Sequence, residues 1–169
     1  MLFANKLLKK SMKLLYYPME TTAHFVAQWV EARTRFSNQL KTLQSEDLKK
    51  KLGDSPNSVG FLIRHIGDVE LLFSKNVFAN TSVHVTAKTV ISGHDTGEWT
   101  DLPALLAYVS ESFDTLQSTL ATQADSVWEE VITTKEFGTK TKAEALGRIV
   151  SHTAYHAGQM ALLIKYGKT

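Results

Sequence analysis

RIVSHTAYHAGQMALLIKY, from Arg148 to Tyr166, is the most informative stretch of the sequence. Ile149, His152, His156 and Met160 recur every three or four residues, so they share one face of a helix. Two imidazoles one turn apart can reach the same ion, and neutral imidazole is the commonest protein ligand for zinc and also suits nickel. A catalytic zinc site uses about three protein ligands. The pair therefore indicates a metal site only if the rest of the chain supplies a third ligand.

The residues around this stretch define the helix that contains it. Thr141 followed by Glu144 matches a capping box, and Gly167 is a typical helix end. Thr153, directly after His152, stands where a zinc peptidase of the H-E-x-x-H type has its glutamate base. Peptide hydrolysis of that type is therefore not expected.

Three further segments carry apolar side chains at helical spacing and predict three more long amphipathic helices. The first runs from Phe25 to about Gln44, where Ser45 opens a short helical turn that stops at Gly53. The second starts at Ser55-Pro56, with Ser55 as cap and Pro56 in the first turn, and its stripe runs from Val59 to Val77. The third opens at Asp101 and ends near Gln123 to Asp125.

Two long connections separate the last three helices. Residues 80–100 lose the helical period, and the β-branched stretch from Val83 to Ile91 has no obvious strand partner. Trp99 in this connection is either part of a lid over a site or an anchor against the following helix. Residues 128–140 form a second loop. Four long helices without a clear strand predict an all-α, four-helix bundle.

The third imidazole is that of His65, which lies within the apolar stripe of the second helix. A lone histidine on an apolar face is usually a core residue whose hydrogen bonds are satisfied. Three inward imidazoles on two helices cannot all be protonated in a dry core, and a bound metal explains them better. His24 flanks a stripe, and His84 and His94 fall in the loop, so none of these three is expected at the site.

Four polar residues near these histidines each have two possible roles. Asp68 and Glu70 follow His65 and either orient an imidazole or are charges on the helix surface. Tyr155 and Gln159 either contact a substrate or a metal-bound water, or make hydrogen bonds across the bundle.

Composition narrows the class of protein. The 169 residues suit one domain, with residues 1–18 as a basic, leucine-rich extension that we expect to be helical. A net charge of +2 does not favour nucleic acid as a partner, and no apolar run is long enough to cross a membrane. The protein lacks a signal-peptide pattern, and we expect it in the cytoplasm. The sequence has no Cys, so any thiol in its chemistry comes from another molecule.

The chain resembles the DinB/YfiT-like superfamily in two motifs. These are Asn57-Ser58-Val59 with Leu62-Ile63-Arg64-His65-Ile66, and His152-x-x-x-His156-Ala157-Gly158-Gln159, within a likeness that runs from about Tyr17 to Gly167. The resemblance implies an up-down-down-up bundle with a long connection between helices two and three. It also implies a zinc or nickel ion held by His65, His152 and His156, and a homodimer. Relatives include transferases that use low-molecular-weight thiols. The chain differs from many relatives at Lys165, where they carry Arg.

Three functions remain open from the sequence. A metal held by three histidines keeps open positions at which it can acidify a thiol or a water. The first function is a transferase that acts on a small-molecule substrate with a small external thiol, which the absence of Cys and of an obvious base favours. The second is a metal-dependent hydrolase. The third is a metal-binding, stress-related protein without catalysis.

Overall fold

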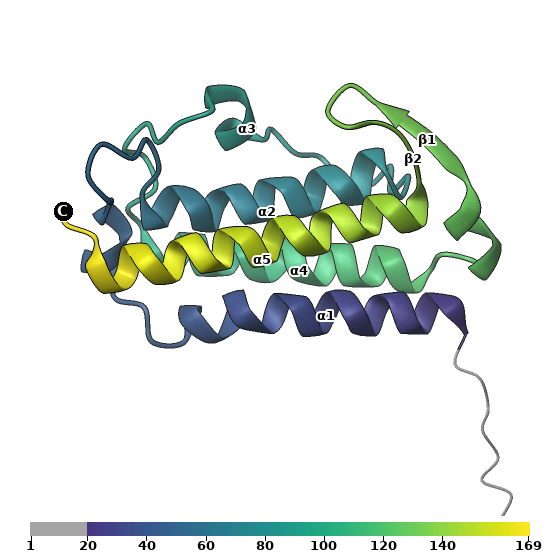
Figure 1. Cartoon of the computed structure of the whole chain (residues 1–169), viewed down its shortest axis with the longest axis horizontal. Coiled ribbons are helices and arrows are strands. Elements are labelled where there is room, and N and C mark those ends of the chain that lie inside the picture. Colours follow the sequence, from purple (N-terminus) through teal and green to yellow (C-terminus); the bar gives the residue numbers. More distant parts are fainter. Residues whose placement is uncertain (1–19) are drawn as a thin grey trace, which may run out of the picture.

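Four long helices make up most of the computed structural model, which describes residues 20–169 (Figure 1). They are α1 (Thr21–Leu40), α2 (Val59–Asn76), α4 (Leu102–Ala121) and α5 (Lys142–Tyr166). The all-α bundle predicted from the apolar stripes is confirmed. The predicted helical extension, residues 1–18, lies outside the described residues.

The helices follow the up-down-down-up order. In Figure 1, α1 and α5 run in one direction and α2 and α4 in the other. The ends confirm this order, because Thr22 at the start of α1 donates its hydroxyl to the Gln123 carbonyl just after α4. At the opposite end, Lys51 before α2 pairs with Lys168 after α5. Residues 77–101 return the chain along the bundle between the parallel helices α2 and α4.

The start of α2 differs from the prediction. Ser58, not Ser55, caps the helix, because its hydroxyl accepts a hydrogen bond from the Phe61 amide at 3.1 Å. Pro56 lies before the helix, and its carbonyl accepts from the Asp95 amide at 2.9 Å. The stretch from Ser55 to Asn57 therefore ties the long connection to the end of the bundle.

The end of α1 also differs from the prediction. The helix ends at Leu40 rather than near Gln44, and a short 3-10 turn covers Ser45–Lys49.

The other two predicted starts are confirmed. Asp101 accepts from the Ala104 amide and caps α4. Thr141 and Glu144 form the reciprocal capping box of α5, and Gly167 follows its last turn. Each capped start satisfies backbone amides that have no partner within the helix.

Both connections contain structure that the sequence did not reveal. Residues 77–101 include the one-turn helix α3 (Lys88–Ser92), where only a loop or a strand fragment was expected. The loop predicted over residues 128–140 holds a hairpin, in which β1 (Val131–Thr134) pairs antiparallel with β2 (Gly138–Thr141). All side chains of residues 131–141 are exposed or half-buried, and the strand Val131–Thr134 does not alternate apolar with polar residues, so its sequence showed no strand period.

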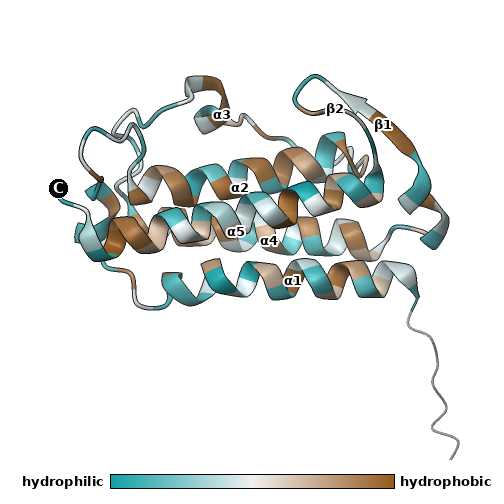
Figure 2. Cartoon of the chain, viewed as in Figure 1, coloured by the Kyte–Doolittle hydropathy of each residue, from teal (hydrophilic) through white to brown (hydrophobic). Residues whose placement is uncertain are grey.

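The apolar interior consists of two clusters, one toward each end of the bundle. The first contains Phe36, Ile63 and Met160, and the second contains Trp29, Phe73 and Ile149. Figure 2 shows the matching alternation of apolar and polar residues along each long helix. Within residues 20–169, no helix combines the length and the apolar character needed to span a membrane.

Trp99 belongs to the first cluster. It is 8% exposed, and Leu102 packs against the same cluster. Trp99 is therefore placed as an anchor for the start of α4, and its position gives no support to a lid.

Candidate metal centre

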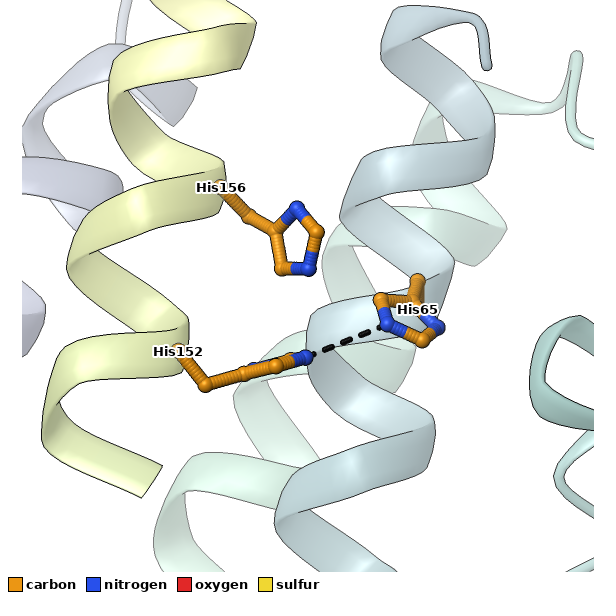
Figure 3. A group of neighbouring side chains, drawn as sticks. All are labelled: His65, His152 and His156. Carbon is orange, nitrogen blue, oxygen red and sulfur yellow. Dashed lines mark hydrogen bonds between the residues drawn. The ribbon is translucent and has the colours of Figure 1, made fainter. Parts of the chain in front are cut away.

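Three imidazoles converge between α2 and α5. His65 projects from α2, and His152 and His156 project from successive turns of α5 (Figure 3). Their candidate ligand atoms all lie within 4.8 Å of one another, and the Nε2 atoms of His65 and His152 are 3.1 Å apart. The three predicted site histidines are thus brought together by the fold.

A hydrogen-bond chain fixes the tautomer of His65. The Thr89 hydroxyl donates its only proton to Asp68 Oδ2 at 2.7 Å. The contact of 3.1 Å between His65 Nδ1 and the same hydroxyl oxygen therefore requires that Nδ1–H donates. His65 Nε2 therefore carries no proton, and its lone pair accepts from His152 Nε2–H at 3.1 Å. An unprotonated Nε2 that faces the other two rings is the form that binds a metal.

Asp68 is held at the centre of this chain. It is fully buried and accepts from the Thr89 amide at 3.0 Å, from the Arg64 guanidinium at 2.8 Å and from the Tyr108 hydroxyl at 2.6 Å. Asp68 therefore acts on His65 through Thr89, without touching the ring itself. Burial and the bond to Asp68 raise the pKa of the Tyr108 phenol.

Glu70 does not belong to the site. It is also fully buried, but it pairs with Arg33 at 2.7 Å and accepts from Ser112 at 2.6 Å within the interior. The reading of Asp68 and Glu70 as surface charges was wrong for both residues. Nothing in the sequence indicated that Arg33 is buried, and only the fold reveals it.

His156 is oriented from its own helix. Gln159 Oε1 lies 2.7 Å from His156 Nδ1, and in this arrangement Nδ1–H donates to the amide oxygen. The Gln159 amide in turn donates to the Tyr155 hydroxyl at 3.0 Å. Tyr155 and Gln159 thus make hydrogen bonds along α5, not across the bundle, and leave His156 Nε2 free to face the cluster.

Burial keeps all three imidazoles neutral. It lowers the pKa of His65 to about 4, with a smaller contribution from His156. Burial, then His156, His65 and Arg148, lower the pKa of His152 to about 3. Burial also lowers the pKa of His156, against the hydrogen bond that His156 donates to Gln159, which raises it. Three neutral imidazoles can bind a metal without a net loss of protons.

The donor set fits a divalent transition metal. Two imidazole nitrogens on one tetrahedral zinc lie roughly 3.3 Å apart, given bonds of about 2.0–2.1 Å. The separation of 3.1 Å between the Nε2 atoms of His65 and His152 is close to this value. His152 differs from the other two, because its Nδ1 is buried and has no hydrogen-bond partner among residues 20–169. It binds a metal through Nε2 only after its proton moves to Nδ1.

A cleft of about 330 Å³ opens beside His152. Its walls come from α2, from α5 and from the hairpin, and are formed by Val69, Phe73, Glu136, Arg148, Ser151, His152 and Tyr155. Space of this size next to the imidazoles can hold a small molecule. Trp99 and the connection over residues 77–101 do not line this cleft.

The remaining histidines lie away from the cluster. His24, His84 and His94 are exposed and do not belong to the cluster, as predicted. Sequence reasoning missed Thr89, because one threonine in an aperiodic connection carries no signal. It also missed Arg148, although its position four residues before His152 places both on one face of α5.

Comparison with known proteins gives one finding. A family model described as the DinB superfamily matches residues 28–160. That range contains all three histidines and most of the four long helices. No curated protein is similar enough in sequence to count as a match.

Proposed function

The chain belongs to the DinB superfamily, and on that premise we propose that His65, His152 and His156 hold one zinc or nickel ion for a thiol transfer reaction. The observation that carries this proposal is the convergence of three neutral imidazoles, two of which are locked with Nε2 toward the cluster. The reaction joins a small external thiol to a second small molecule.

The bound ion supplies acidity, since it lowers the pKa of a coordinated thiol. The chain supplies orientation and space. Thr89 and Gln159 hold two of the rings, and the cleft beside His152 admits the second molecule. In the net reaction, sulfur forms a bond to an electrophilic carbon, the leaving group departs with the electrons of the broken bond, and the thiol proton passes to solvent.

Thiol transfer is preferred because the protein has no thiol of its own, and because no carboxylate belongs to the histidine cluster within residues 20–169. The sequence has no Cys. Thr153 is fully buried and its hydroxyl has no partner among residues 20–169, so it cannot serve as a base toward the cleft. A metal-dependent hydrolase is the second candidate, and the presence of Glu136 in the cleft lining favours it, since a carboxylate there could accept a proton from water.

Metal content tests the site. We expect about one equivalent of zinc or nickel per chain in the purified protein. Alanine at His65, His152 or His156 should reduce this content sharply, whereas His84→Ala, a change at an exposed histidine, should not. Equal metal content in all four variants would show that the cluster is not a metal site.

Spectroscopy tests the reaction class. The cobalt-substituted protein would be titrated with bacillithiol, glutathione and cysteine, and sulfur coordination followed as a ligand-to-metal charge-transfer band. A band that saturates with one of these thiols supports the transferase. If none of them alters the spectrum, a hydrolase or a metal-binding protein without catalysis becomes the better explanation.

A further inference from the structure

The cleft beside His152 has an apolar floor. Val69 and Phe73 line it from α2 and are 5% and 3% exposed. The Phe73 ring also stacks on Phe137 of the hairpin at 5.8 Å between centroids. A ligand in this cleft therefore meets a fixed hydrocarbon surface, which favours a molecule with an apolar body.

Arg148 has no ion-pair partner within residues 20–169. Arg148 lines the cleft one helical turn before His152, and its guanidinium lies 5.8 Å from the Phe137 ring. No carboxylate lies within ion-pair distance of it in residues 20–169, whereas Arg33 and Arg64 are each paired with a buried acid. Glu136 lines the same cleft, and among the ion pairs of the described residues none joins it to Arg148. A planar guanidinium with free donors is suited to bind a carboxylate through two hydrogen bonds.

The site as a whole is positively charged, as Arg148 is. Three neutral imidazoles leave the two positive charges of a bound ion uncompensated, and no carboxylate belongs to the cluster among the described residues. With Arg148 and Glu136 counted, the cleft and its ion carry a net positive charge. Such a site attracts anions more strongly than neutral molecules.

We propose that this cleft binds the second substrate of the reaction, a small monocarboxylate with an apolar body. Its carboxylate pairs with Arg148, its hydrocarbon part lies on Val69 and Phe73, and its far end reaches the histidine cluster. Four residues of a helix span about 6 Å, so a chain of about four to six carbon atoms bridges Arg148 and His152. The placement of the reactive end rests on the proposed function, but the binding of the carboxylate does not.

Calorimetric titration with hexanoate tests the proposal on both the metal-free and the cobalt-loaded protein. We expect saturable binding of hexanoate, and affinities at least tenfold weaker for hexanamide, which lacks the charge, and for acetate, which lacks the apolar body. Loading with cobalt should tighten hexanoate binding. Equal affinity for hexanoate and hexanamide would overturn the assignment.

Variants locate the binding site. Arg148→Met should weaken hexanoate binding at least tenfold. The affinity of Arg148→Lys for hexanoate should lie between those of Arg148→Met and the wild type. Arg35→Met is the matched control, because Arg35 is also an exposed arginine on a long helix but lies on α1. Its affinity should remain within about twofold of the wild type. Unchanged affinity in Arg148→Met, with normal helix content by circular dichroism, would refute the role of Arg148.

The two proposals fail in different measurements. Cobalt stoichiometry is measured without hexanoate and reports only on the histidines. If cobalt does not bind but hexanoate still binds the metal-free protein through Arg148, the cleft assignment stands and the metal centre fails. If cobalt binds and hexanoate does not, the metal centre stands and the cleft assignment fails.

Discussion

Thr89 shows how one hydroxyl group can determine the state of an imidazole on another element. It projects from the one-turn helix α3, is fully buried, and links His65 on α2 to Asp68 on the same helix. Its proton is committed to Asp68, so its lone pair accepts the Nδ1 proton of His65. The hydroxyl therefore makes the Nε2 atom of His65 available to a metal.

Replacing Thr89 by Val tests this role. Valine keeps the shape but cannot accept from Nδ1 or donate to Asp68, so His65 loses its fixed tautomer. We expect zinc affinity, measured by competition with a chelator, to fall by about 10–100-fold. Thr86→Val is the control, because Thr86 is an exposed threonine in the same connection, and its zinc affinity should match the wild type. Wild-type affinity in Thr89→Val would mean that Thr89 only packs.

The residues of the site differ in how far the sequence revealed them. The three histidines lie within periodic apolar stripes, so their inward direction followed from helical spacing. Asp68 was predicted as one of two alternatives, since a carboxylate three residues after His65 can lie on either face. Thr89 could not be predicted, because its position depends on how the connection folds over α2.

At the scale of elements, glycine determines how closely α2 approaches its neighbours. A Cβ added at Gly60 would overlap the Trp99 carbonyl oxygen, and one at Gly67 would overlap the Tyr108 ring of α4. The backbone before α4 cannot yield as a flexible side chain can. Gly60 therefore sets the distance between the start of α2 and the segment that anchors α4.

Gly60→Ala should destabilise the protein. The added methyl group would overlap the Trp99 carbonyl oxygen, and overpacking of this kind costs about 1–3 kcal/mol or more in the free energy of unfolding. Gly147→Ala is the matched control, because Gly147 lies within α5 and an added Cβ there meets nothing within 4 Å. That change should stabilise the helix by up to about 1 kcal/mol. Urea unfolding measures both, and similar effects of the two substitutions would contradict the close approach.

Elements were predictable where their residues are strongly patterned. The apolar stripes and the caps at Asp101 and Thr141 located α4 and α5 well. The start of α2 was placed too early, because Ser55-Pro56 fits a helix start locally and only the contact with Asp95 shows its other use. The hairpin was missed because its short, mostly polar strands pack only Ile132 and Phe137 against the interior.

At the scale of the molecule, the histidine cluster lies at the boundary between the two apolar clusters. Along α2, His65 stands between Ile63 of the first cluster and Val69 of the second. Along α5, Ile149 of the second cluster precedes the histidine pair and Met160 of the first cluster follows it. The imidazoles are therefore surrounded by apolar side chains at both ends, which is why burial dominates the shifts in their pKa.

This arrangement predicts that acid destabilises the metal-free protein. The pKa of His65 is about 4 and that of His152 about 3 in the folded state, both lowered from 6.5. Between pH 6.5 and about 4, the unfolded chain binds protons at these residues that the folded chain does not. The free energy of unfolding therefore falls as the pH falls through this window, by about 3 kcal/mol at most for His65 alone.

Urea unfolding of the metal-free protein at several pH values between about 7 and about 4.5 measures this dependence. His152→Leu removes one buried imidazole and should lose less stability on acidification than the wild type. His24→Gln removes an exposed imidazole and should keep the wild-type slope. If His152→Leu and the wild type have parallel dependences on pH, the His152 imidazole is not a source of the acid sensitivity.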